Sequence, residues 1–271
     1  MEASVTDWLH DRIKLGRSDL YAGRLGLGAA YGAPAAAWEA AFDAGCNLFY
    51  WGALRNKKMA EAIRNLIAQG KREQMIIMIQ VFRRSSGGLE KSLQRGLKKL
   101  GLDYADIMLL GWRGKPVSEK LLEQAMTLKS QCRFRYLGIS SHNRSVFPQL
   151  AQDPRYEIFM LRYNAANRGA DVDIFPHLPE ARPGIIAFTA TRNMSLVKSG
   201  KIPSEEKRPT AGDCYRFVLS NPNVDVAISA PSKMEQMLQN LTGVAKGPMR
   251  EEEMAWMRRV GDFVYGKKRE F

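Results

Sequence analysis

Residues 75–110 read MIIMIQVFRRSSGGLEKSLQRGLKKLGLDYADIMLL, and this stretch decides the fold class of the chain. The apolar runs 75–81 and 104–110 are typical of strands that are buried on both faces. Between them, apolar residues recur at helical spacing over 89–100. Two neighbouring strands joined by a helix run parallel, because the helical crossover returns the chain to the same end of the sheet. The stretch therefore predicts a β-α-β unit.

The same alternation continues along the chain in both directions. The expected strands are 24–30, 47–50, 75–81, 104–110, 135–140, 157–163, 184–188 and 224–229. The helices expected after them are 34–44, 57–69, 89–100, 118–130, 145–152, 172–181, 213–220 and 234–241, with a last helix at 251–265. The segment 194–210 is expected to be a long loop. Eight units in 271 residues predict an α/β protein, a (β/α)8 TIM barrel with a C-terminal extra helix, with 1–271 as one domain.

An open, doubly wound sheet is the competing arrangement. Such a sheet usually carries a GxGxxG turn after its first strand, whereas residues 26–28 supply only GLG. We favour the barrel, in which functional residues lie at the carboxyl ends of the strands.

Composition narrows the classes of function. The chain is 45% hydrophobic and 25% charged, which is ordinary for a globular protein. Cys46, Cys132 and Cys214 are far apart and have no CxxC spacing, which argues against a disulfide framework and against structural zinc. No apolar run reaches the roughly 18 residues of a membrane span, and the first residues lack the order of a secretory signal. We therefore expect a cytoplasmic protein with no metal and no membrane partner.

The positive charge is concentrated in one segment. The chain has 41 Lys+Arg against 28 Asp+Glu, a formal charge of +13, and residues 55–99 hold twelve of the basic residues and three acids. In a barrel, helices 57–69 and 89–100 are neighbours, so this segment predicts one basic flank. A nucleic acid would use such a flank, but Phe82 is its only aromatic residue, so we favour a solvated surface over a nucleic-acid partner.

The strand ends resemble those of the aldo-keto reductase family over about residues 15–241. The motifs that carry the resemblance follow in family order: RLGLGAAYG (24–32), AAFDAGCNLFYWG (40–52), LGLDYADIMLLGW (100–112), FRYLGISSHN (134–143), LRYNAANRG (161–169), GIIAFTATR (184–192) and VAISAPSKMEQMLQNL (226–241). The family is a (β/α)8 barrel that reduces carbonyls with NADPH and without a metal. The resemblance implies the same fold and cofactor here.

The resemblance also implies that the family's catalytic Asp, Tyr, Lys and His are all substituted. The corresponding residues are Tyr50, Arg55, Gln80 and Gly111. Gln80 carries no charge and Gly111 no side chain, and loss of a general acid costs roughly 10²–10⁴ in rate. Tyr50 and Arg55 are the candidate catalytic residues, because a phenol or a fixed cation can still act on a carbonyl oxygen. The alternative is that Tyr50 fills space and Arg55 is solvated.

The cofactor positions are closer to the family pattern. By resemblance, NADP(H) would contact Ser140 and Ser141 at its carboxamide and Phe188 at the nicotinamide face. Ser229, Ser232 and Lys233 match positions near its adenosine phosphates, and Asn240 matches a position at its adenine end. Trp51, Trp112 and His142 are candidates for the substrate pocket. The expected function is an NADP(H)-dependent oxidoreductase acting on an aldehyde- or ketone-type substrate, weakly or with other residues. The open alternative is a non-catalytic NADP(H)-binding or interaction protein.

Overall fold

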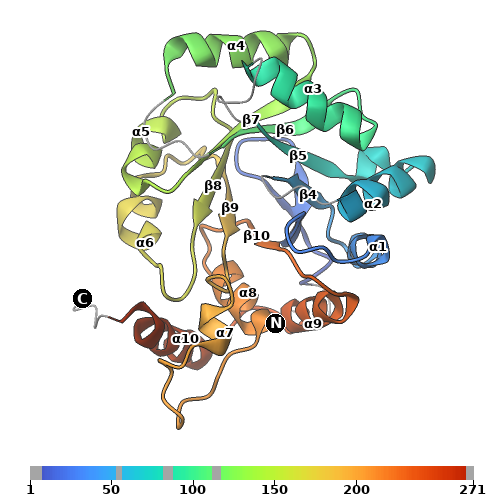
Figure 1. Cartoon of the computed structure of the whole chain (residues 1–271). Helices are drawn as coiled ribbons and strands as arrows, with labels where there is room; N and C mark the ends of the chain where they lie inside the picture. Colours follow the sequence, from blue (N-terminus) through green and yellow to red (C-terminus); the bar gives the residue numbers. More distant parts are fainter. Residues whose placement is uncertain (1–7, 53–56, 82–87, 112–116, 267–271) are drawn as a thin grey trace.

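A closed barrel of eight parallel strands forms the centre of the molecule (Figure 1). The computed structural model describes residues 8–52, 57–81, 88–111 and 117–266. The strands are β3 (Leu25–Gly28), β4 (Leu48–Trp51), β5 (Ile76–Val81), β6 (Ala105–Leu110), β7 (Phe134–Ser141), β8 (Ile158–Arg162), β9 (Gly184–Phe188) and β10 (Val226–Ser229). Because β10 pairs with both β9 and β3, the sheet has no edge. The predicted barrel is confirmed, and the open sheet is wrong.

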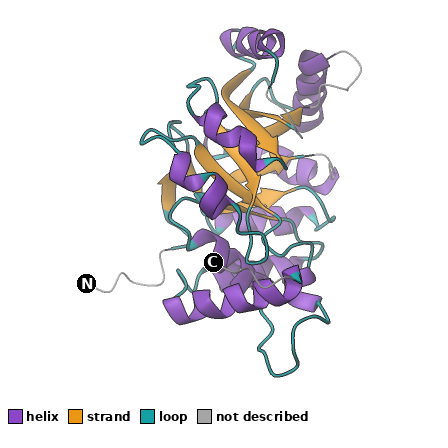
Figure 2. Cartoon of the chain, turned by 90° about the vertical axis from the view of Figure 1, so that its left-hand side faces the viewer, coloured by secondary structure: helices purple, strands orange, loops and turns teal. Residues whose placement is uncertain are grey.

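Helices surround the barrel (Figures 1 and 2). They are α1 (Ala35–Asp43), α2 (Lys57–Ala68), α3 (Gly88–Leu100), α4 (Glu119–Ser130), α5 (Phe147–Ala151), α6 (Ala170–Asp173), α7 (Ser195–Lys198), α8 (Ala211–Leu219), α9 (Met234–Val244) and α10 (Glu251–Tyr265). Helix α10 is the predicted C-terminal extra helix. No helix in the described ranges is long and apolar enough to cross a membrane.

One predicted helix is wrong, a hairpin was missed, and the predicted loop 194–210 contains the short helix α7. The segment 172–181 holds only the end of α6 and the 3-10 turn Phe175–His177. Pro176 and Pro179 explain this, because proline lacks the N–H group and clashes with the preceding turn of a helix. The missed element is a hairpin of β1 (Arg12–Lys14) and β2 (Tyr21–Gly23).

That hairpin closes the amino end of the barrel. Leu15 and Leu20 are buried and belong to the apolar cluster inside the barrel. Gly16 has a φ of 51° and bridges Pro183, and a Cβ on Gly16 would collide with the backbone nitrogen of Gly184. Only glycine allows this close approach. The carboxyl ends of the strands form the opposite end, which we call the mouth.

A repeated polar contact stabilises the amino end. A side chain at the start of every second strand accepts a hydrogen bond from a neighbouring backbone N–H. The four pairs, at 2.7–2.9 Å, are Asn47 with Gly23, Asp106 with Ile77, Glu157 with Leu137, and Asp225 with Ile185. The three carboxylates also form ion pairs, Asp106 with Arg72 and Arg135, Glu157 with Lys129, and Asp225 with Arg182. These contacts fix the register of the strands far from the mouth.

Candidate active site

The alternation of side chains along the strands determines which residues face the mouth. Inward positions form an apolar cluster that includes Ile76, Met78, Ile158 and Met160, and side chains two residues further along a strand share their face. The last inward positions of four strands are therefore Tyr50 on β4, Gln80 on β5, Arg162 on β8 and Phe188 on β9. This layer is the candidate active site.

Tyr50 and Gln80 are joined across two neighbouring strands. Tyr50 Oη donates a hydrogen bond of 2.6 Å to Gln80 Oε1. Gln80 is fully buried, and Tyr50 is half-buried. The tyrosine ring also covers Gly52, where a Cβ would collide with the ring. The hydroxyl of Tyr50 is thus held in one direction by a neutral amide.

Gly111 completes this group. A Cβ on Gly111 would collide with Gln80 Nε2 and would lie 2.8 Å from both Cγ and Cδ of Gln80. The amide of Gln80 therefore occupies the space that a side chain at position 111 would need. The structure brings three of the four predicted catalytic positions together, as Tyr50, Gln80 and Gly111, and the fourth, Arg55, lies outside the described residues.

His142, Arg162 and Phe188 form a second group at the mouth. The rings of His142 and Phe188 meet edge to face, with centroids 5.6 Å apart. Arg162 Nη2 lies 2.7 Å from His142 Nδ1. Partial burial, and then the positive charge of Arg162, lower the pKa of His142. The imidazole is therefore neutral at pH 7, with Nδ1 as acceptor and its proton on Nε2. Sequence reasoning missed Arg162. Arg162 follows Met160 by two residues and Ile158 by four, and this spacing indicates that the three side chains share one face of the strand.

The two serines of β7 lie beside this group. Ser140 and Ser141 are buried, and Ser140 is in register with Met160 on β8. Ser141 Oγ donates to the carbonyl oxygen of Asn143 at 3.1 Å and accepts from its backbone nitrogen at 2.9 Å. This turn directs the chain away from the barrel after β7 and helps to place His142.

The start of α9 carries the predicted phosphate contacts. Lys233 is the N-cap residue and is exposed. The backbone nitrogen and the hydroxyl of Ser232 both donate to Gln236 Oε1, at 2.9 and 3.0 Å. Both donors of Ser232 are therefore already bound by a side chain of the same helix.

Ser229 and Asn240 have a different role in this structure. Asn240 Nδ2 donates to Ser229 Oγ at 3.1 Å, and both residues are buried. Tyr215 of α8 also hydrogen-bonds to Ser229. The pair joins β10 to α9, so contact of these two side chains with a cofactor stays a prediction.

Trp51 and Trp112 were both predicted to line the substrate pocket. Trp51 is 1% exposed and belongs to the apolar cluster between the barrel and the helices. Its prediction as a pocket residue needs correction, because its position next to Tyr50 on the strand turns it to the outer face. Trp112 lies outside the described residues.

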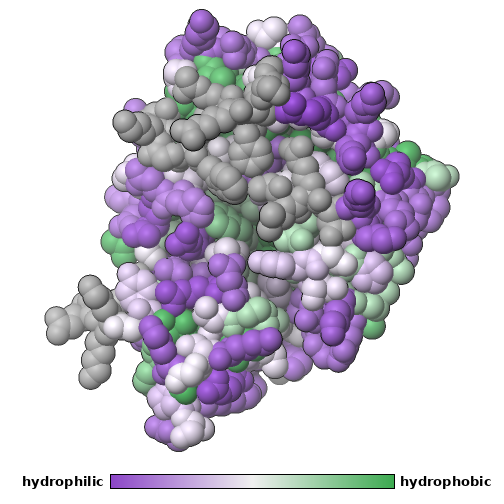
Figure 3. Space-filling view, in the orientation of Figure 1, coloured by the Kyte–Doolittle hydropathy of each residue, from purple (hydrophilic) through white to green (hydrophobic). Residues whose placement is uncertain are grey.

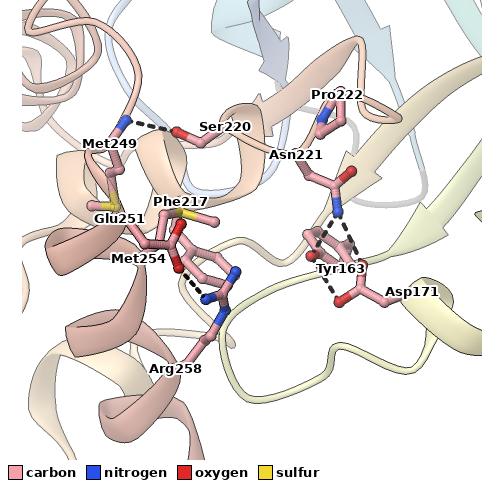
Figure 4. A pocket seen from close by; sticks show the side chains of 10 residues that line it. All are labelled: Tyr163, Asp171, Phe217, Ser220, Asn221, Pro222, Met249, Glu251, Met254 and Arg258. Carbon is pink, nitrogen blue, oxygen red and sulfur yellow. Dashed lines mark hydrogen bonds and ion pairs between the residues drawn. The ribbon is translucent and has the colours of Figure 1, made fainter.

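Among the described residues, side chains outside the barrel line a small and a larger hollow. One, of about 290 Å³, lies between α6, α8 and the start of α10 (Figure 4). There Asn221 donates to Asp171 and to the hydroxyl of Tyr163, and burial raises the pKa of both Tyr163 and Asp171. The other hollow, of about 810 Å³, begins at His142 and is lined also by Arg144 and Asp173, which form an ion pair of 2.6 Å. Only the second hollow adjoins the mouth.

The basic flank is present and is partly neutralised by the protein itself. The side chains over α2 and α3 are strongly hydrophilic (Figure 3). Four of the basic residues have partners within the chain: Lys58 with Glu61, Lys71 with Asp43, Arg72 with Asp106, and Arg64 with the carbonyl oxygen of Lys99. That this flank is a solvated surface and does not bind nucleic acid stays a prediction.

Comparison with known proteins identifies the family. A closed (β/α)8 barrel with polar and aromatic residues at its carboxyl end defines a class of barrel with a ligand-binding mouth. The model of the aldo/keto reductase family matches residues 33–211, and the chain belongs to this family.

Individual relatives are distant. The methylglyoxal reductase YeaE of Escherichia coli K12 is 22% identical over 170 residues, which are 61% of this chain and 60% of that protein. The chain therefore matches less than two thirds of the length of this relative.

Solved structures match over nearly the whole chain. The holo form of the aldo-keto reductase AKR11C1 from Bacillus halodurans has a TM-score of 0.76 at 19% identity, covering 93% of this chain and 96% of that one. An aldo-keto reductase from Klebsiella pneumoniae, solved in complex with NADPH, has a TM-score of 0.74 at 20% identity, covering 96% and 97%. At such identities the likeness shows the fold.

Proposed function

We propose that this chain binds NADP(H) at the mouth and acts as an oxidoreductase on an aldehyde- or ketone-type substrate, weakly or through residues other than the family's usual four. Membership of the family supports the reaction class. The observation that carries the proposal is the half-buried ring of Phe188 on the inner face of β9, in register with Arg162 of β8 and above the apolar interior.

The residues fit such a cofactor at both of its ends. Stacking on a nicotinamide needs only a ring face, which Phe188 offers. Helix α9 has eleven residues, and the N–H groups at its start favour an anion, with the exposed Lys233 adding a cation. The fit is incomplete along β8, because Met160 has no group that can donate to a carboxamide.

The residues of the site are less suited to proton transfer than to cofactor binding. When bound, NADPH supplies a hydride, and the chain has to place a donor at the carbonyl oxygen. Tyr50 has the only phenol of the mouth layer among the described residues, and its hydroxyl already donates to Gln80. A neutral amide orients this hydroxyl but does not lower its pKa as an ammonium would. We therefore infer slow turnover, with Tyr50 as proton donor.

A non-catalytic NADP(H)-binding protein is the second candidate. The buried amide of Gln80, which is bonded to Tyr50 and fills the space at Gly111, favours it. In this case the three residues stabilise the mouth and no proton is transferred.

Two measurements test these proposals. Calorimetric titration with NADPH is expected to show saturable binding, and Lys233→Ala is expected to weaken it about two- to fivefold, in line with the about 0.3–1 kcal/mol of a charge at a helix end. Lys246→Ala, which removes an exposed lysine just beyond the other end of α9, is the matched control and should bind as wild type.

The second measurement follows NADPH oxidation with an aldehyde present. If turnover is detectable, Tyr50→Phe should reduce kcat by roughly 10²-fold or more, because it removes the donor. Unchanged turnover would remove Tyr50 from the mechanism, whereas NADPH binding without carbonyl-dependent oxidation would favour the second candidate.

A further inference from the structure

We propose that Arg162, held by His142 beside Phe188, binds an anionic group of the ligand at the mouth, either a carboxylate of the substrate or a phosphate of the cofactor. The inference rests on the proposed function, because it concerns the ligand of the same mouth. It assigns to that ligand a chemical feature, a negative charge close to Phe188.

The first support is the position of Arg162. It is the last residue of β8 and lies in register with Phe188 on β9. Ile158 and Met160, on the same face of the strand, point into the apolar interior. The exposed side chain of Arg162 therefore leaves the strand at the inner rim of the barrel.

The second support is the orientation of the guanidinium group. One of its nitrogens, Nη2, donates to Nδ1 of His142 at 2.7 Å, and the ring of His142 is held edge-on against Phe188. A guanidinium has five N–H donors, so this contact fixes the group and leaves other donors for a ligand. Because Nδ1 accepts from Arg162, the proton of the neutral ring is on Nε2.

The third support is the charge around Arg162. Several other arginines of this fold have carboxylate partners, as in the pairs Arg144–Asp173, Arg168–Asp262, Arg182–Asp225 and Arg216–Glu253. Within the described ranges, Arg162 has no carboxylate at ion-pair distance, and its guanidinium contacts the neutral ring of His142. A fixed guanidinium without a counter-charge is suited to carboxylate and phosphate ligands, which it binds through two parallel hydrogen bonds.

Calorimetry with small probes tests the proposal without requiring turnover. The full chain is titrated at low salt with benzoate, with benzamide as the neutral analogue of the same shape, and with NADPH. The variant is Arg162→Gln, and Arg162→Lys keeps the charge without the forked geometry. Arg144→Gln is the matched control, because Arg144 is an exposed arginine at the same end of the barrel that already has a carboxylate partner.

We expect benzoate to bind at least about tenfold more tightly than benzamide, and Arg162→Gln to remove this difference, since hydrogen bonds between charged groups are among the strong ones. Arg162→Lys should retain part of the affinity, and Arg144→Gln should bind as wild type. If Arg162→Gln weakens NADPH at least tenfold and leaves benzoate unchanged, the anion is a phosphate of the cofactor. If Arg162→Gln changes neither ligand, the anion site is refuted while NADP(H) binding stands. If wild type binds benzoate through Arg162 but does not bind NADPH, the proposed function fails and the anion site stands.

Discussion

At the scale of single residues, Tyr50, Gln80 and Gly111 form one unit, because each limits what the others can be. The hydroxyl of Tyr50 needs the oxygen of Gln80, and the amide of Gln80 needs the space above Gly111. A side chain at position 111 would have to displace Gln80, and a charged side chain at position 80 would be buried. A side chain at position 111 alone would therefore create a clash, and a charged side chain at position 80 alone would create a buried charge.

A double-mutant cycle tests this unit. Gly111→Ala should destabilise the protein by about 1–3 kcal/mol, because the new Cβ collides with a fully buried side chain in a packed site. In a Gln80→Ala background the same change should cost much less, since the colliding atoms are gone. Urea denaturation of the four proteins gives the coupling free energy. Additive costs would contradict the contact.

At the scale of elements, α10 is attached to the barrel by close backbone packing and by ion pairs. A Cβ on Gly261 would collide with the carbonyl oxygen of Ala165, in the segment between β8 and α6. Arg168, which is 4% exposed, contacts Asp262 of α10 at 2.8 Å. Arg216 of α8 is also buried and bonds Glu253 of α10 through both of its terminal nitrogens, at 2.7 and 3.0 Å.

Gly261→Ala measures the packing of this helix. Alanine improves helix propensity by about 1 kcal/mol, so on propensity alone the variant would be more stable. We expect the reverse, a loss of about 1–3 kcal/mol in the free energy of unfolding, because the clash is with backbone that has no other rotamer. Gly200→Ala is the control, because Gly200 has open space around its Cα. A Gly261→Ala protein that is more stable than wild type would show that α10 does not pack in this way.

Glu253→Gln measures the ion pair and its dependence on pH. The hydrogen bond from Arg216 is the main cause that lowers the pKa of Glu253 from 4.5. A carboxyl group whose pKa is lower in the folded state stabilises the protein at pH values above its pKa in the unfolded state. This stabilisation is lost as the pH falls through its pKa in the folded state.

The variant should therefore be less stable than wild type by about 1–3 kcal/mol at pH 7, and the gap should narrow as pH falls below about 4.5. Glu252→Gln, on the exposed side of the same turn, should stay within about 0.5 kcal/mol of wild type at both pH values. A gap for Glu253→Gln that is independent of pH would argue against the ion pair.

The elements also show what the sequence could and could not reveal. Long periodic segments were predictable: the expected bounds of 251–265 and 184–188 are those of α10 and β9. The hairpin of β1 and β2 has only three residues in each strand, too few for a periodic pattern, and its turn depends on contact between Gly16 and a segment 167 residues further along the chain. The mouth was predictable as a place, but which side chains enter it depends on the alternation along each strand, and a shift of one residue turns Trp51 outward and Arg162 inward.

At the scale of the whole molecule, the amino end of the barrel contributes to stability, and we propose that the mouth binds the ligand. The amino end holds the repeated carboxylates and the hairpin, and the mouth holds Tyr50, Gln80, Arg162, Phe188 and the start of α9. We expect changes at the amino end to alter stability and to leave ligand binding unchanged.

Asp225→Asn tests this division. It removes the charge that binds Arg182 at 2.7 and 2.8 Å, so we expect a loss of about 2–4 kcal/mol, below the upper range for breaking a buried pair because Arg182 is partly exposed. The affinity for NADPH should be that of wild type as long as the variant remains folded. Weakened NADPH binding without a loss of stability would contradict the separation of the two ends.

The central claim is the proposal that the mouth of this barrel binds NADP(H). A calorimetric titration of the full chain with NADPH tests this claim most directly. We predict saturable binding of one NADPH per chain with a Kd of about tens of micromolar or tighter, a free energy of roughly −6 kcal/mol or more favourable. The absence of saturable binding in this range would contradict the claim.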